Sequence, residues 1–453
     1  MSEIVVKNKR PFGFYVCCIA FMFERMAYYS AKYLIFVFVS ATIITGGLGL
    51  TVVEAAIIQS NLVAFTYLAP LIGGYLSDRH IGARYCIPVG LVLMAVGYIV
   101  GGSATNVFTM NVMVALVSIG TGLFKGNNAA ISGALFEDKS QLDSAFSVQY
   151  SFVNVGSLIG TTAIGVLIAT TFSKGDVQGF RAAFVLCGII CVIDAVWFLF
   201  GMKYLGEIGK KPFKEGKHME KKVVTEIKPL TRVEKRKVFA IALISIFSVV
   251  FWVFWYLTYL AVYDYGAKFV NLNLGSFAVP LSWFDSLNAF VCIVMGPVLG
   301  ILWFKLSKRS KGDLSLFKKL GLGLSLLGMS FLMLVGAEIS RGTGKASIIW
   351  IIAFGVLLSM GEMLFSPLGN SFVTKYAPNK IYSVLMGVWI FATFIAGKSY
   401  GYLYGFASKF PIIQAYVVIP IILFVFAVLL FVFDKKLIKL LEDEEPAKEI
   451  NVV

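Results

Sequence analysis

Twelve apolar runs, each long enough to cross a lipid bilayer as a helix, follow one another along this 453-residue chain. They cover residues 12–40, 51–76, 84–104, 107–136, 144–172, 181–203, 237–265, 281–305, 317–338, 347–374, 382–406 and 411–434. The composition agrees, because 58% hydrophobic residues, 14% charged residues and a mean hydropathy of +0.83 exclude an ordinary soluble domain. We therefore predict an all-α integral membrane protein with about 12 transmembrane helices.

The positive charges predict which side of the membrane the chain ends face. When the residues at the span ends are counted with the adjoining loops, 30 of the 40 Lys and Arg residues belong to the two termini and the even-numbered loops, 6 belong to the opposite loops, and 4 lie deep inside the predicted spans. Because basic residues gather on the cytoplasmic side, we predict a multi-pass protein of the cell (inner or plasma) membrane with both termini in the cytoplasm. The same distribution explains the net charge of +15, so we expect no nucleic-acid partner.

A polar, lysine-rich stretch divides the predicted spans into two groups of six. This stretch, residues 204–236, reads as a cytoplasmic linker between an N-terminal bundle (1–203) and a C-terminal bundle (237–434), with a cytoplasmic tail at 435–453. Two six-helix bundles joined in this way are the layout of major-facilitator transporters, whose substrate site lies between the halves. The expected architecture is therefore a major-facilitator fold.

The loop after the second predicted span resembles the signature loop of that superfamily. It begins with Gly73 and Gly74 and continues with Asp78, Arg79 and Arg84. Glycines let helices approach closely, and the charged residues predict a cytoplasmic latch that breaks when the bundles rock. The alternative, that the two arginines only anchor the topology, does not account for Asp78 and the glycines.

The first predicted span carries ionisable residues at a depth where they are costly. On a helix, Phe21, Arg25, Tyr28 and Lys32 share one face, and Glu24 lies one turn from Tyr28. Each charge at the centre of a membrane helix costs roughly 2.5–3.5 kcal/mol on insertion scales, so such residues normally face a water-filled cavity. The stripe therefore predicts one wall of a polar chamber.

Polar residues in later spans complete this chamber. The first half adds Lys125 and Asn154, and the second half adds Asn288 and Glu362. The first half thus supplies cations and the second half an anion, so an empty closed cavity would pair Lys125 with Glu362. A zwitterion would replace that pair, with its carboxylate at Arg25 and Lys125 and its ammonium at Glu362. Peptides and free amino acids both fit these charges.

Nothing in the sequence favours enzymatic chemistry. The two histidines and six cysteines show no metal-ligand or disulfide spacing, and no nucleophile–base pair is visible. We therefore expect a transporter without cofactor or metal rather than an enzyme. A membrane sensor that has lost transport stays open as an alternative.

Motifs in both halves resemble those of the proton-dependent oligopeptide transporter (POT or PTR) family of the major facilitator superfamily. Glu24-Arg25 and the tyrosines after it are similar to the second half of the family's E-x-x-E-R element. The Gly-Thr-Gly-Leu-Phe-Lys run ending at Lys125 is similar to its span-4 element, and Tyr150 with Asn154 to its span-5 element. Gly361-Glu362 with Ser366-Pro367, followed by Met386-Gly387-Val388-Trp389, is similar to its spans 10 and 11.

The resemblance implies import of di- or tripeptides by proton-coupled alternating access. It implies that Arg25 and Lys125 hold the peptide carboxylate and that Glu362 holds the amine. It further implies that the cavity is lined by Tyr28, Tyr29, Tyr67, Asn154 and Asn288. The expected partners are a peptide, protons and the lipid bilayer, and we expect a monomer.

Departures from the family pattern change what we expect of the energy source. Phe21 stands where the family has the first glutamate of its element, so we predict altered proton coupling with Glu24 as the remaining carboxyl there. The family's span-7 acid is also missing, which leaves Lys32 without its usual partner. Asp264 and Asp285 are the two candidates to replace that acid in an outer gate.

Two further departures leave questions of substrate and coupling open. Lys398 stands where the family has an asparagine, and amino acids or another zwitterionic or anionic metabolite become the favoured substrates if it faces the cavity. Asp194 in the sixth span has no counterpart in the family pattern. It fits a buried structural acid at least as well as a proton relay.

Overall fold

The computed structural model describes residues 10–136, 142–212, 230–309, 314–378 and 381–442. Within these ranges, twelve long α-helices coincide with the twelve predicted spans. The helices are α1 (Phe12–Ser40), α2 (Val52–Arg79), α3 (Ala83–Gly102), α4 (Val107–Ala134), α5 (Leu142–Ala169), α6 (Phe180–Gly201), α7 (Arg232–Phe269), α8 (Trp283–Ser307), α9 (Leu316–Arg341), α10 (Ile348–Tyr376), α11 (Tyr382–Ala407) and α12 (Ile412–Leu441).

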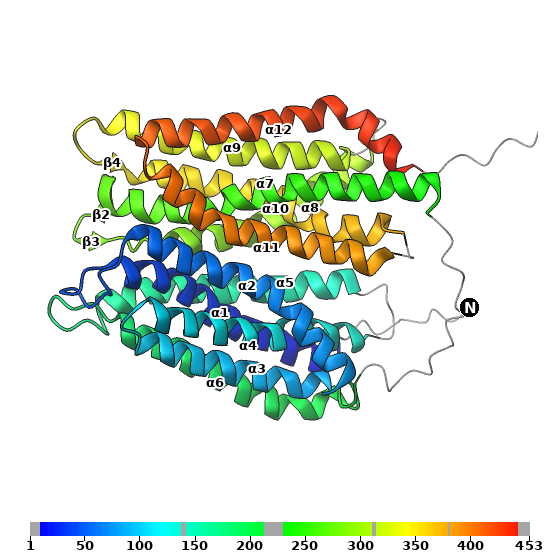
Figure 1. The fold of residues 1–453 in the computed structure, drawn as a ribbon, viewed down its shortest axis with the longest axis horizontal. Helices are drawn as coiled ribbons and strands as arrows, with labels where there is room; N and C mark the ends of the chain where they lie inside the picture. Colours follow the sequence, from blue (N-terminus) through cyan, green and yellow to red (C-terminus); the bar gives the residue numbers. More distant parts are fainter. Residues whose placement is uncertain (1–9, 137–141, 213–229, 310–313, 379–380, 443–453) are drawn as a thin grey trace, which may run out of the picture.

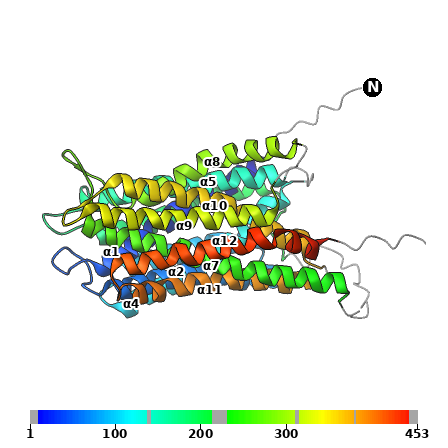
Figure 2. The same ribbon diagram turned by 90° about the horizontal axis from the view of Figure 1, so that it is seen from above.

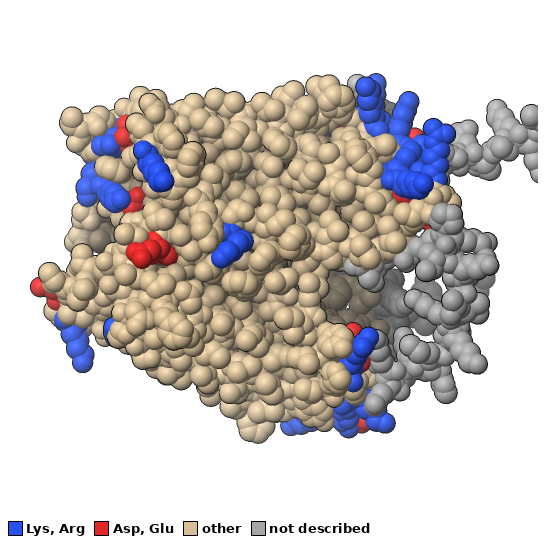
Figure 3. All heavy atoms as spheres, in the orientation of Figure 1, with Lys and Arg blue, Asp and Glu red and all other residues tan. Residues whose placement is uncertain are grey.

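The helices form two bundles that lie side by side, α1–α6 in one and α7–α12 in the other (Figure 1). The first helix starts and the last helix ends at the same end of the molecule. We call this the linker end, because α6 and α7 also meet the connecting segment there. Figure 3 shows Lys and Arg at both ends of this face, with the denser groups at the linker end, where the surface is also hollowed between the bundles.

Short elements decorate the helix ends. A single 3₁₀ turn, η2 (Met202–Leu205), follows α6. Four two-residue strands lie at the opposite end of the molecule, which we call the hairpin end: β1 (Val270–Asn271), β2 (Asn273–Leu274), β3 (Phe277–Ala278) and β4 (Ala346–Ser347). β1 pairs in parallel with β4, and β2 pairs antiparallel with β3.

Capping residues explain where several helices start. The hydroxyl of Thr51 accepts from the backbone N–H of Glu54, whose side chain bonds back, and this capping box begins α2. The same arrangement of Thr231 with Glu234 begins α7. That helix therefore starts several residues before the predicted span at 237, because the cap lies in polar sequence outside the apolar run.

Eleven of the twelve described helices are long and apolar enough to cross a membrane by length and composition alone. The twelfth is α1, which carries Glu24, Arg25 and Lys32 in its middle. These three side chains are all at least 93% buried, so α1 places them against other helices rather than against lipid. The prediction of an all-α, multi-pass membrane fold is confirmed.

Glycines set the closest helix contacts inside the first bundle. A Cβ added at Gly73 of α2 would lie 2.0 Å from the carbonyl oxygen of Gly122 on α4, and one added at Gly156 of α5 would lie 2.1 Å from the carbonyl oxygen of Met22 on α1. Only glycine permits these approaches. Gly74, by contrast, has nothing within 4 Å, so of the two adjacent glycines only Gly73 allows close packing.

The two bundles pack most extensively along two helix pairs, α5 with α8 and α2 with α11 (Figure 2). On α11 the contact is made by Gly397, Gly401 and Gly405, which repeat every four residues and so share one face. A Cβ on Gly401 would lie 2.7 Å from the carbonyl oxygen of Ala56 on α2. We call this contact the small-residue seam.

Candidate functional site

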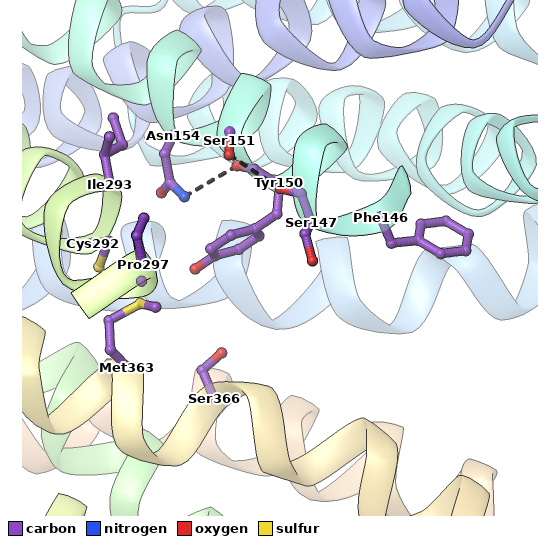
Figure 4. Close-up of a pocket in the computed structure, with 11 residues that line it drawn as sticks. Phe146, Ser147, Tyr150, Ser151, Asn154, Cys292, Ile293, Pro297, Met363 and Ser366 are labelled. Carbon is purple, nitrogen blue, oxygen red and sulfur yellow. Dashed lines mark hydrogen bonds between the residues drawn. The ribbon is translucent and has the colours of Figure 1, made fainter. Parts of the chain in front are cut away.

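A cavity of about 420 Å³ lies between the bundles and is lined by helices of both. A second cavity of about 780 Å³ adjoins it, and the two share Phe146, Tyr150 and Ser366. In the second cavity, Tyr150 and Asn154 of α5 lie across from Met363 of α10 (Figure 4). The Asn154 amide bonds the Tyr150 carbonyl oxygen of its own helix at 3.1 Å, so its carbonyl oxygen is left for other partners.

The first bundle gives the smaller cavity a cationic wall. The guanidinium of Arg25 donates to both carboxylate oxygens of Glu24, at 2.5 and 2.6 Å, and lies 4.4 Å from the ring centre of Tyr28. Lys125 lies 4.6 Å from the ring centre of Tyr67, and no described carboxylate lies within 4.0 Å of its ammonium. Glu24 itself is fully buried behind Arg25 and does not line the cavity.

The second bundle gives the cavity a carboxylate. Glu362 of α10 lines it, and the side-chain amide of Asn288 on α8 donates to this carboxylate at 2.8 Å and to the Ser359 hydroxyl at 3.0 Å. Asn288 therefore orients Glu362. We had expected Asn288 to line the cavity, but it lines neither of the two cavities. The predicted pair between Lys125 and Glu362 is not formed in this open arrangement, because no described cation lies within 4.0 Å of Glu362.

Aromatic side chains form the rest of the cavity wall. The predicted residues Tyr28, Tyr29 and Tyr67 line it, and Tyr28 also bonds Thr66 at 3.2 Å. Three aromatic residues of α7 that sequence reasoning missed line it as well: Trp252, Trp255 and Tyr256. Their spacing of three and four residues places them on one helix face, which was the available signal.

An ion pair closes the hairpin end of the cavity. Lys32 lies 3.3 Å from Asp285 on α8 and 3.5 Å from the ring centre of Tyr259 on α7. The hydroxyl of Tyr263 donates to the other oxygen of Asp285. Of the two acids predicted as partners of Lys32, Asp285 is therefore the one beside it. Asp264 instead pairs with Lys268 of its own helix at 2.6 Å.

The residues of the predicted cytoplasmic latch stay within the first bundle. The buried guanidinium of Arg84 donates to the carbonyl oxygens of Gly206 at 2.7 Å and Ile208 at 2.8 Å, just after η2. Arg79 donates to the Tyr75 hydroxyl at 3.3 Å. Asp78 pairs with no residue in the described ranges. In this arrangement none of the three latch residues forms a hydrogen bond or ion pair with a described residue of the second bundle.

Comparison with known proteins shows which superfamily has this architecture. A family model described as the Major Facilitator Superfamily matches residues 18–397. The chain belongs to the major facilitator superfamily. This major facilitator is 24% identical to dipeptide and tripeptide permease A of Pectobacterium carotovorum subsp. carotovorum, over 88% of its own length and 85% of the relative. It is also 24% identical to a di-/tripeptide transporter of Lactococcus lactis subsp. cremoris, over 93% of its length and 94% of the relative.

A solved structure gives the same fold for this major facilitator. A POT family transporter in complex with 5-aminolevulinic acid superposes with a TM-score of 0.84 at 23% identity, over 94% of this chain and 97% of that chain. The predicted major-facilitator fold is therefore confirmed. The relatives are named as transporters, which agrees with our expectation that the chain is not an enzyme.

Proposed function

We propose that this chain is a POT-family transporter that moves di- or tripeptides across the membrane by alternating access. The cavity between the bundles carries the proposal, because it places Arg25 and Lys125 on one wall and Glu362 on the other. A substrate with a carboxylate at one end and an ammonium at the other satisfies both walls at once. The peptide-permease names of the relatives support the same substrate class.

Each end of a peptide has a specific partner in this proposal. The carboxylate binds Lys125 and Arg25, and it competes with Glu24 for the guanidinium. The ammonium binds Glu362, which Asn288 holds in position. Peptide side chains extend into the larger cavity beside Tyr150, where about 780 Å³ is available. A free amino acid would leave that volume unfilled, which favours peptides.

The distribution of charge supports an orientation of the protein in the membrane. Lys and Arg gather at the linker end, which supports cytoplasmic termini and a cavity that is open to the cytoplasm. The ion pair between Lys32 and Asp285 then lies on the outer side of the cavity and serves as the outer gate. We assign no gating role to Asp264, because its partner is Lys268.

The proton coupling proposed here differs from the family pattern. Phe21 packs edge-to-face on Phe124, with ring centres 5.3 Å apart, so the position of the family's first glutamate is filled by apolar packing. Glu24 and Glu362 remain as carboxyl groups of the site. Because the substrate ammonium competes with a proton at Glu362, a proton carried together with the substrate in a monomer is held by the other carboxyl group, Glu24.

Lys398 gives no support to the runner-up substrates. Its ammonium bonds Asn61 of α2, and it lines neither of the two cavities between the bundles. We therefore use amino acids and organic anions only as comparison ligands in the assays. Counterflow of a labelled dipeptide in proteoliposomes tests the proposal, because exchange needs the substrate-loaded protein to alternate between its two conformations but needs no ion gradient.

A thermal-shift series on the purified protein complements the flux assay. Stabilisation by a ligand grows with its concentration relative to its dissociation constant, so a dipeptide should stabilise more than its C-terminal amide, its N-acetyl form or either free amino acid. Counterflow of amino acids but not of dipeptides would replace the proposed substrate. Binding of dipeptides without any counterflow would identify a sensor.

A further inference from the structure

Asp194 lies on the buried face of α6, and the other buried residues of this helix are apolar. Cys187, Cys191 and Phe198 lie one turn apart on the same face, and all are fully buried. Asp194 itself has 0% exposure, and neither of its carboxyl oxygens has a hydrogen-bond partner among the described residues. No cavity described above reaches it.

An ionised carboxylate enclosed in this way, without a partner, is strongly disfavoured, because it loses its hydration and gains nothing in return. The neutral acid is therefore the form that fits this site. A neutral acid carries an O–H group, however, and here that donor has no acceptor. A purely structural acid would normally bond a neighbouring helix, so the site holds a proton that lacks a partner in this conformation.

Few groups surround Asp194 that could exchange a proton with it. The groups that interact electrostatically with the Asp194 carboxyl are Glu24 of α1 and Cys191 of α6 itself. Tyr98 of α3 and Arg25 of α1 are neighbours of Cys191 rather than of Asp194. The Glu24 carboxylate interacts electrostatically with the Asp194 carboxyl, and both are fully buried. Arg25 holds Glu24 in place by two hydrogen bonds, and α6 packs on α1 near Asp194, where the Trp197 indole donates to the Val16 carbonyl oxygen.

We propose that Asp194 is a proton-binding site of this transporter and that it shares its proton with Glu24 when a substrate carboxylate takes over Arg25. The Asp194 O–H then donates to a Glu24 oxygen, so one proton is held between two carboxyl groups and their joint charge stays at −1. The proposal rests on the proposed function, because it uses Arg25 as the carboxylate site. In this proposal α6 supplies the second carboxyl group of the site, because α1 has Phe21 where the family has a glutamate.

The sharing couples binding of substrate to retention of a proton. Without substrate, Arg25 stabilises Glu24 as an anion and the Asp194 O–H has no acceptor, so the two carboxyl groups hold their shared proton less tightly. With substrate bound, Glu24 loses the guanidinium and gains the hydrogen bond from Asp194. Removing the acid from position 194 therefore leaves binding and exchange of substrate in place but breaks the link to the proton gradient.

The test compares two assays on Asp194→Asn in proteoliposomes, with Ser118→Ala as control because Ser118 is another buried side chain of this bundle without a described partner. We expect dipeptide counterflow within about twofold of the parent protein and a loss of about tenfold in accumulation driven by a proton gradient. The control should change neither. Asp194→Glu, which keeps a carboxyl group, should restore part of the accumulation and guards against a folding defect.

Infrared spectroscopy tests the proton itself without any substrate. The parent protein should show a C=O band of a protonated carboxyl that shifts in D₂O, and Asp194→Asn should lack it. Absence of this band in the parent protein, or full proton-driven accumulation by Asp194→Asn, overturns the proposal. Absence of counterflow in the parent protein overturns the proposed function instead, while the infrared result still decides whether Asp194 holds a proton.

Discussion

Lys32 of α1 and Asp285 of α8 form the ion pair that joins the two bundles within the described residues. Both side chains are only 4% exposed, and both have a second partner on α7, Tyr259 for the lysine and Tyr263 for the aspartate. One buried contact therefore ties three helices together at the closed end of the cavity.

Removing either partner of this pair should open the closed end. Lys32→Ala or Asp285→Ala leaves one buried charge unpaired, which typically costs about 3–5 kcal/mol. We expect a cysteine placed near this end to react faster with a membrane-impermeant reagent in either variant. The double swap Lys32→Asp with Asp285→Lys should recover part of the transport, and a swap that transports no better than the single variants would exclude a gate.

Lys268 provides the matched control for that experiment. Its ion pair with Asp264 has the shorter distance, 2.6 Å, but the lysine side chain is 52% exposed. Exposed pairs contribute about 0–1 kcal/mol, so Lys268→Ala should leave both stability and labelling unchanged.

Glu362 and Asn288 should act as a unit on the amino end of the substrate. Glu362→Gln removes the charge that binds the ammonium, and Asn288→Ala frees the carboxylate to move. We expect the two variants to lower affinity for a dipeptide by about tenfold or more, and the double variant to lose less than the product of the single losses. An N-acetylated dipeptide, measured in the same binding assay, should be insensitive to both changes.

Gly73 and Gly74 make a closely matched pair for testing helix packing. A side chain at Gly73 meets the Gly122 carbonyl group, whereas one at Gly74 meets nothing within 4 Å. Gly73→Ala should lower the free energy of unfolding by about 1–3 kcal/mol through overpacking. Gly74→Ala should be neutral or slightly stabilising. Equal unfolding curves for the two variants in detergent would contradict the described contact between α2 and α4.

Arg84 should hold the start of the linker against the first bundle. Its bonds to the Gly206 and Ile208 carbonyl oxygens are charge-assisted, and such bonds contribute about 1.5–3 kcal/mol each. Arg84→Ala should therefore speed limited proteolysis of this segment. Arg79→Ala, which removes one exposed bond to Tyr75, should be cleaved at the same rate as the parent protein.

The fold could be read from the sequence because a bilayer leaves few solutions for an apolar run of about 20 residues. The helix limits were less accessible. At α7 the capping box of Thr231 and Glu234 starts the helix in polar sequence, where hydropathy gives no signal.

The site could be predicted only in part. The sequence shows which side chains are charged, but it does not show which way each side chain points. Arg25 and Glu362 line the cavity as expected, because an isolated charge must face water or a partner. Asn288 instead lies behind Glu362, and Lys398 faces Asn61. Trp255 was missed because a tryptophan in an apolar run is usually part of a core.

The small-residue seam has a consequence for the energy difference between the conformations of this transporter. Gly397, Gly401 and Gly405 place no side chain against α2, so no side chains at these three positions have to disengage when the two helices separate. A seam of this kind can part without repacking at the glycines, which helps to keep both conformations within reach of a single ligand's binding energy. A wedge such as Gly401→Leu would then act as a mechanical bias, holding the bundles apart at the seam and favouring the alternative conformation without touching the binding site.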